Sequence, residues 1–231
     1  MKFKIVLFPG SNCDRDTFWG LHKIMNYEVS TIWHEETNLG KPDVIILPGG
    51  FSYGDYLRPG AIARFSPIMS AIVEFANSGG IVIGICNGFQ ILCESGLLPG
   101  TLQINAGGRF ICKNTWIRVE NSETKLSYSM KKGEILKTPV ANKEGRFYAK
   151  PHQLHKMNQN GQIIFRYCDK NGVLSPSSNP SNSIENIAGI CNFGKNVFGM
   201  MPHPERALDI DLKNTDGQKI FRSLCLSNLS S

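Results

Sequence analysis

A cysteine between two glycines is the residue of this chain best placed to do chemistry. Cys86 lies in Gly84-Ile85-Cys86-Asn87-Gly88, after an apolar β-branched run at 81–83 and before a segment with helical spacing at 89–94. Glycines two positions before and after leave room for a sharp strand-to-helix turn that presents a nucleophile. The helix dipole and free amides would stabilise a thiolate there. On the pentapeptide alone, a buried structural cysteine in a glycine-rich turn explains the pattern equally well.

A cysteine nucleophile needs a base, and the base needs a group that orients it. Of five histidines, His203 is the best candidate, because it follows a strand-like run at 197–201 and stands between Pro202 and Pro204. Prolines favour extended backbone, so the side chains of His203 and Glu205 should point to the same side. We therefore predict a catalytic triad of Cys86, His203 and Glu205, against the simpler alternative of an ordinary turn. The other histidines are predicted to be surface or packing residues: His22, His34, His152 and His155.

Acyl transfer also needs two donors for a tetrahedral oxyanion. The amide of Asn87, directly after the nucleophile, is one natural donor. The other is the amide of Gly50, in the flexible turn Pro48-Gly49-Gly50-Phe51 that follows a predicted strand. A phosphate cradle is the competing interpretation of this glycine pair, and it ranks lower because no Lys-Ser/Thr follows.

The elements that must position these residues alternate between strand and helix over the first hundred positions. Strands are predicted at 4–8, 28–33, 44–47 and 81–85; helices are predicted at about 14–25, capped by Asn12 or Asp14, and at 66–78, with Ser66 as cap and Pro67 as first residue. This rhythm predicts an α/β fold with a parallel sheet and helices on both faces. The turns after the strands then meet at the carboxyl edge of the sheet, where such folds bind ligands.

From about Phe110 the pattern changes to strand-like runs with little helix between them. These runs cover 116–120, 135–140, 162–168, 187–191 and 197–201, and a final helix is predicted at about 216–226. We interpret them as added antiparallel strands that return to the core sheet near Val197. The Pro/Ser/Asn-rich segment 175–183 is predicted to be a surface loop rather than a linker, so the chain is predicted to be a single domain over 1–231.

Composition excludes several classes of protein. Hydrophobic residues make up 41% and charged residues 19%, which is ordinary for a globular protein, and the net charge of +6 comes from scattered Lys and Arg. We therefore expect no nucleic-acid partner. Seven cysteines without CxxC pairs argue against a disulfide framework and against a zinc site, and suit a reducing cytoplasm. No apolar stretch approaches the ~20 residues of a membrane span, and the first apolar run ends at Pro9.

Taken together, the segments with chemistry carry a family resemblance. The chain resembles class I glutamine amidotransferases, which have a Cys-His-Glu triad, a Gly-x-Cys-x-Gly elbow and a late Pro-x-Pro-Glu segment. It is more closely similar to the discrete glutaminase subunits of phosphoribosylformylglycinamidine synthase, of purine biosynthesis. The segments that carry this similarity span almost the whole chain: 8–16, 48–58, 84–90, 186–192 and 201–206.

The resemblance implies a flavodoxin-like core and hydrolysis of glutamine to glutamate and ammonia through a Cys86 thioester. It also implies that Gln90 contacts the substrate glutamine. Ammonia would pass to a separate synthetase subunit that uses ATP and Mg and converts formylglycinamide ribotide to its amidine, with a small third protein as a bridge. No metal or cofactor is expected on this chain itself.

Two segments depart from the family pattern. Asn142-Lys143 stands where the family usually has His-Gly, and Asn179-Pro180-Ser181-Asn182-Ser183 where it tends to have Asn-Pro-Asn-Gly-Ser. Neither segment lies in the triad. If these departures have an effect, we expect it to fall on docking to the synthetase or on the coupling between the glutaminase and synthetase sites. Arg109, Arg146 and Arg206 fit interface or anion contacts and simple surface roles equally well.

Two other functions remain open from the sequence. A thiol hydrolase or stress protein of the same fold tends to carry His directly after the elbow cysteine, whereas this chain has Asn87 there. A catalytically silent docking subunit is the other alternative, and the intact triad residues argue against it.

Overall fold

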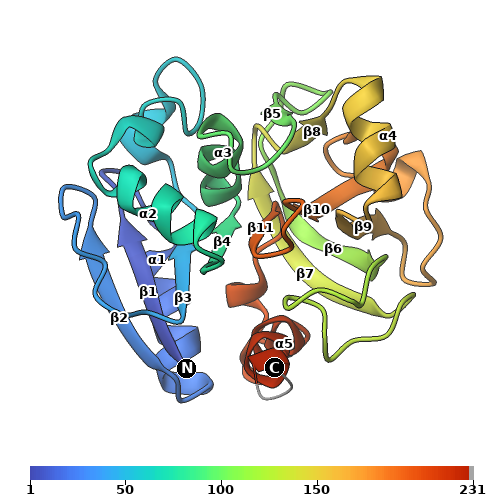
Figure 1. Cartoon of the computed structure of the whole chain (residues 1–231). Helices are drawn as coiled ribbons and strands as arrows, with labels where there is room; N and C mark the ends of the chain where they lie inside the picture. The colour runs from blue at the N-terminus through green and yellow to red at the C-terminus, as the bar shows by residue number, and fades with distance from the viewer. Residues whose placement is uncertain (229–231) are drawn as a thin grey trace.

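A computed structural model describes residues 1–228 of the chain, which build one large mixed sheet and a small two-stranded sheet (Figure 1). The strands of the large sheet are β1 (Lys2–Leu7), β2 (Glu28–Trp33), β3 (Val44–Leu47), β4 (Ile81–Ile85), β6 (Ile111–Val119), β7 (Ile135–Asn142), β9 (Ile163–Cys168), β10 (Ile187–Cys191) and β11 (Val197–Met200). The small sheet pairs β5 (Thr101–Gln103) with β8 (Arg146–Tyr148). The α-helices are α1 (Asp14–Trp19), α2 (Ile68–Asn77), α3 (Asn87–Glu94), α4 (Pro151–Gln159) and α5 (Gly217–Asn228).

One half of the large sheet is parallel, in the order β2-β1-β3-β4-β11. Every residue of β3 and β4 is buried, as expected for apolar strands covered on both faces. The connection from β1 to β2 moves one way across the sheet and that from β3 to β4 moves the other way. Because such crossovers are right-handed, α1 and α2 cover opposite faces, and the strand order reverses at β1 and β3. The predicted α/β fold is confirmed.

The other half of the sheet, β10-β9-β6-β7, is antiparallel throughout. The two halves meet where β11 pairs in parallel with β4, with Met200 opposite Ile85. The expected return of the chain to the core sheet near Val197 is confirmed. This pairing matters for function, because the turn after β11 comes to lie beside the turn after β4.

The helix starts predicted from capping residues were wrong in detail. Cys13, rather than Asn12 or Asp14, occupies the N-cap of α1, and its side chain makes no capping hydrogen bond. The α-helix ends at Trp19 and continues as a π-helical segment, Gly20–Ile24. Pro67 is the N-cap of α2, so that helix begins at Ile68. In neither case does a side chain cap the first turn.

Helix α4 was missed by the sequence analysis, which expected little helix after Phe110. Its apolar face is narrow, with only Leu154 and Met157 buried, so the helical period is weak. His152 and His155 lie on it, exposed as predicted. The predicted surface loop at 175–183 is in part packed into the protein, with its buried polar residues satisfied locally: the Asn179 amide donates to the carbonyl of Ser183 at 2.8 Å.

Within residues 1–228, no helix combines the length and the apolar character needed to cross a lipid bilayer.

Candidate active site

Cys86 lies on a strained turn between β4 and α3. Its backbone has φ 51° and ψ −103°, a conformation that residues other than glycine rarely adopt, and the residue is 5% exposed. Its amide donates to the carbonyl of Met200 in β11 at 2.8 Å, and its Sγ lies 3.8 Å from the carbonyl oxygen of Ala141. Strain of this kind persists only where the surrounding structure enforces it, and it is concentrated at functional sites.

The two glycines of the elbow are required by close backbone contacts. A Cβ on Gly88 would lie 1.9 Å from the carbonyl oxygen of Leu47, at the end of the neighbouring strand β3. A Cβ on Gly84 would lie 2.5 Å from the carbonyl group of Gly88 itself. The strand, the turn and the first helical turn are therefore packed backbone to backbone, and this packing holds Cys86 in its strained conformation.

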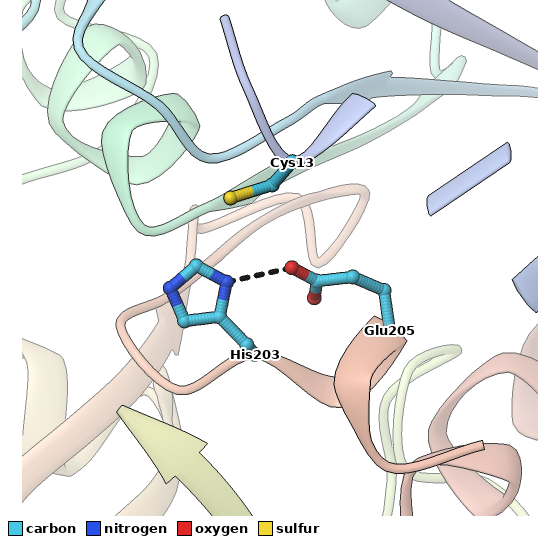
Figure 2. Close-up of side chains that lie close together, drawn as sticks. All are labelled: Cys13, His203 and Glu205. Carbon is cyan, nitrogen blue, oxygen red and sulfur yellow. Dashed lines mark hydrogen bonds and ion pairs between the residues drawn. The ribbon is translucent and has the colours of Figure 1, made fainter. Parts of the chain in front are cut away.

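His203 and Glu205 form a buried ion pair beside the elbow, after β11. Nδ1 of His203 lies 2.6 Å from Oε1 of Glu205, and their side chains are 1% and 0% exposed (Figure 2). Pro204 begins a 3₁₀ turn over Pro204–Arg206, which brings both side chains to the same side as the sequence predicted. Among the described residues, nothing makes a hydrogen bond to Nε2 of His203. The second ring nitrogen is thus free to exchange a proton.

The charge environment favours the imidazolium form of His203. Burial alone would lower the pKa of His203, but the charge of Glu205 and the nearby Cys86 and Cys13 raise the pKa well above its usual range. Cys86 is thus close enough to interact with the imidazole electrostatically, although the two make no hydrogen bond of good geometry in this state. Catalytic hydrogen bonds of enzymes without substrate are often loose in this way.

The turn after β3 is held in place by the turn after β1. Asn12 donates its amide to the carbonyl of Gly49 at 3.4 Å, and Phe51 donates to the carbonyl of Gly10 at 2.9 Å. Gly50 itself has φ +153°, and a Cβ there would lie 2.8 Å from Cα of Ser11. No hydrogen bond among residues 1–228 uses the amide of Gly50.

Asn87, the other predicted oxyanion donor, opens α3, so its N–H has no acceptor within the helix. The side chain of Asn87 ties the two turns together, since its Oδ1 accepts from the amide of Ser52 at 3.1 Å. Its Nδ2 donates to Oε1 of Gln90 at 2.9 Å and to Oδ1 of Asp55 at 3.3 Å. The structure thus places both predicted donor residues next to the elbow.

Gln90 lies one helical turn after the nucleophile and is buried, 6% exposed. Its Nε2 donates to the carbonyl of Glu144 at 2.7 Å. Glu144 follows Asn142-Lys143, so the segment that departs from the family pattern lies against the elbow helix rather than far from the site. Asn105 supports this segment, because its Nδ2 donates to the carbonyl of Asn142 at 3.0 Å.

Asp55 and Cys13 also belong to the site, although the sequence alone did not indicate either residue. Burial, followed by the charge of Glu144, raises the pKa of Asp55 to about 6. Cys13 lies against the His203–Glu205 pair, and Figure 2 shows its sulfur beside the imidazole ring. Neither has a local signal of its own, because each reaches the site through a turn from a different strand.

The fold and this arrangement of residues define a class of protein, and comparison with known proteins agrees. The model of the CobB/CobQ-like glutamine amidotransferase domain family matches residues 1–223. The chain belongs to this glutamine amidotransferase family, whose core is flavodoxin-like.

Particular relatives are similar over nearly their whole length. The phosphoribosylformylglycinamidine synthase subunit PurQ of Koribacter versatilis is 52% identical over 224 residues, which is 97% of each chain. The corresponding subunit of Salinibacter ruber is 51% identical over 223 residues, covering 96% of this chain and 95% of the relative. A chain in the solved structure of PurLQS from Thermotoga maritima superposes with a TM-score of 0.87 at 40% identity, covering 98% of both chains.

Proposed function

We propose that this chain is the glutaminase subunit of phosphoribosylformylglycinamidine synthase. The observation that carries the proposal is the strained Cys86 turn beside the buried His203–Glu205 pair, on a chain about half identical to the PurQ subunits. The subunit hydrolyses glutamine and supplies ammonia to a synthetase that makes formylglycinamidine ribotide from formylglycinamide ribotide in purine biosynthesis.

In this proposal the Cys86 thiolate attacks the side-chain amide carbon of glutamine, and the imidazolium of His203 donates its proton to the leaving nitrogen. The C–N bond breaks, ammonia leaves and a glutamyl thioester remains on Cys86. His203 then takes a proton from water, which attacks the thioester and releases glutamate. Glu205 holds the imidazole in the tautomer with hydrogen on Nδ1 and stabilises its cation.

The amides of Gly50 and Asn87 are the proposed donors to the oxyanion. Gln90 is the proposed contact for the substrate glutamine, and its present bond to the Glu144 carbonyl fixes the position of its side chain beside the elbow. The reaction needs only protein groups and water, so we propose no catalytic metal or cofactor on this chain. ATP and Mg belong to the synthetase step on the partner.

The proposed partners are the synthetase subunit and a small bridging subunit, with glutamine as substrate and no nucleic acid or membrane. The proposed location is the cytoplasm. We also propose that 1–231 act as one domain, because the large sheet runs without interruption from the first strand to the last. Residues 229–231 lie outside the described residues.

The test is co-purification with the candidate synthetase and bridging subunits, followed by glutamine turnover with and without them. We expect a stable complex that makes the amidine from glutamine, and a lone subunit that turns over glutamine only slowly. A complex that uses ammonia but never glutamine would support the silent docking subunit instead. Rapid hydrolysis of peptides or of glycated thiols by the lone chain would favour the thiol hydrolase.

A further inference from the structure

A second thiol, which the proposed reaction does not use, lies against the catalytic base. Cys13, His203 and Glu205 bring a sulfur, a ring nitrogen and a carboxylate oxygen within 4.8 Å of one another, and the three side chains point toward a common centre (Figure 2). The residues are 3%, 1% and 4% exposed. Cys13 lies about 190 positions before His203 in the chain, so no ligand spacing in the sequence reveals the cluster.

The cluster has unused coordinating capacity. Oε2 of Glu205 is buried and has no hydrogen-bond partner among the described residues. Buried carboxylate oxygens are normally satisfied, so the carboxylate of Glu205 keeps an unused acceptor oxygen besides the one that pairs with His203. A thiolate, an imidazole and a carboxylate are the ligand types that Zn²⁺ takes in proteins.

We propose that Sγ of Cys13, Nδ1 of His203 and the carboxylate of Glu205 form an inhibitory binding site for a thiophilic divalent cation of the zinc type. Binding would form metal–sulfur, metal–nitrogen and metal–oxygen bonds, with water as the fourth ligand. The thiol proton of Cys13 and the proton on Nδ1 of His203 would leave to solvent. No electron transfer is involved.

The inhibitory effect rests on the proposed function, in which His203 is the catalytic base. The metal would coordinate Nδ1 of His203, the nitrogen that otherwise pairs with Glu205. An imidazole coordinated through Nδ1 carries its remaining proton on Nε2. Nε2 then cannot accept the proton of Cys86 or of water, so glutamine hydrolysis stops. Synthesis from free ammonia takes place on the partner subunit and does not need His203.

Neighbouring charges act on the site in both directions. Nη2 of Arg206 lies 3.3 Å from Sγ of Cys13, where its charge favours the thiolate but repels a dication. Asp16 offsets this repulsion, because its Oδ2 pairs with Nε of Arg206 at 2.9 Å. Burial raises the pKa of Cys13, with His203, Glu205 and Arg206 as the charged groups that face it.

The first experiment titrates buffered free Zn²⁺ into the assembled complex and measures synthesis from glutamine and from ammonia in parallel. We expect Zn²⁺ to inhibit only the glutamine-dependent reaction, with reversal by a chelator. Loss of a group that only hydrogen-bonds to a metal ligand costs about 10–100-fold in metal affinity. Cys13→Ala removes a ligand itself, so it should raise the inhibitory Zn²⁺ concentration by about 100-fold or more. Cys112→Ala removes an exposed thiol and is the matched control, with inhibition unchanged.

The second experiment locates the metal without using activity. Co²⁺ bound to a thiolate gives a charge-transfer absorption band, which we expect to persist in Cys86→Ala and to disappear in Cys13→Ala and in Cys13→Ser, the closer isostere. A band lost in Cys86→Ala and kept in the Cys13 variants would place the metal on the nucleophile and overturn the proposal, as would no binding to the intact protein. Metal-free glutamine turnover, measured in the same preparations, tests the proposed function separately.

Discussion

Nδ1 of His203 and Oε1 of Glu205 are 2.6 Å apart, in a place where neither side chain reaches solvent. Pro204 separates the two residues in the chain and begins the 3₁₀ turn that brings both side chains to the same side. Burying two charged groups costs desolvation energy. Removing one member of the pair leaves the other as a buried charge without a counter-charge. A fold retains it most readily where the pair does chemical work.

Glu205→Gln should therefore lower glutamine-dependent kcat by about 10³–10⁴-fold, because the amide no longer selects the tautomer with hydrogen on Nδ1. Steady-state kinetics of the complex with glutamine, and with ammonia as control, check this. Ammonia-dependent synthesis should stay intact. A variant that kept glutamine-dependent kcat within a few-fold would remove Glu205 from the triad.

Cys86→Ala should abolish glutamine-dependent synthesis, with a loss of at least about 10³-fold, since the thioester has no other nucleophile to form on. The fold should persist, because alanine keeps the Cβ at the strained position and removes only Sγ. Circular dichroism and ammonia-dependent turnover of the complex are the controls. Unimpaired use of glutamine would disprove the assignment of the nucleophile.

Gly88→Ala should destabilise the protein by about 3 kcal/mol or more, since the new Cβ would lie 1.9 Å from a backbone carbonyl oxygen that cannot rotate away. Gly107→Ala is the matched control, because no heavy atom lies within 4 Å of the added Cβ. Chemical denaturation of both variants measures the free energy of unfolding. Equal stability of the two would contradict the packing of the elbow against Leu47.

Deprotonation of Asp55 should lower the free energy of unfolding of the protein as the pH rises from about 4 to 6. Burial and the charge of Glu144 raise the pKa of Asp55 to about 6, above its value of 3.8 in an unfolded chain. Between about pH 4 and 6 the folded state therefore binds more protons than the unfolded state, so deprotonation at higher pH disfavours folding.

Asp55→Asn removes this titration, so its Tm should rise relative to the parent protein as pH increases from 4 to 7. Thermal unfolding across this range measures the difference, with Asp211→Asn, at an exposed position, as the control for loss of one charge. A Tm difference for Asp55→Asn that stays constant, or that shrinks with rising pH, would contradict the sign worked out above.

Some parts of the fold could be predicted closely. β3 matches its predicted bounds. Its four consecutive apolar residues are all buried, and Asp43 before them and Pro48-Gly49-Gly50 after them mark where the strand begins and ends. Helix α4 could not be predicted, since two buried residues in nine leave almost no helical period. The predicted start of α2 was wrong by one residue, because the Ser66 hydroxyl pairs with the hydroxyl of Tyr53 at 2.9 Å rather than capping the helix.

The sequence by itself determined the elbow, since the two glycines around Cys86 and the apolar strand before it are local requirements of a sharp turn. It also determined that His203 and Glu205 point the same way, because the prolines around them restrict a short stretch of backbone. Only the tertiary structure decided what surrounds them. The parallel pairing of β11 with β4 brings His203 to Cys86, and the turn after β1 brings Cys13 to the other side of the imidazole. Such contacts join residues far apart in the chain, and their geometry depends on strand order and register, which no local pattern encodes.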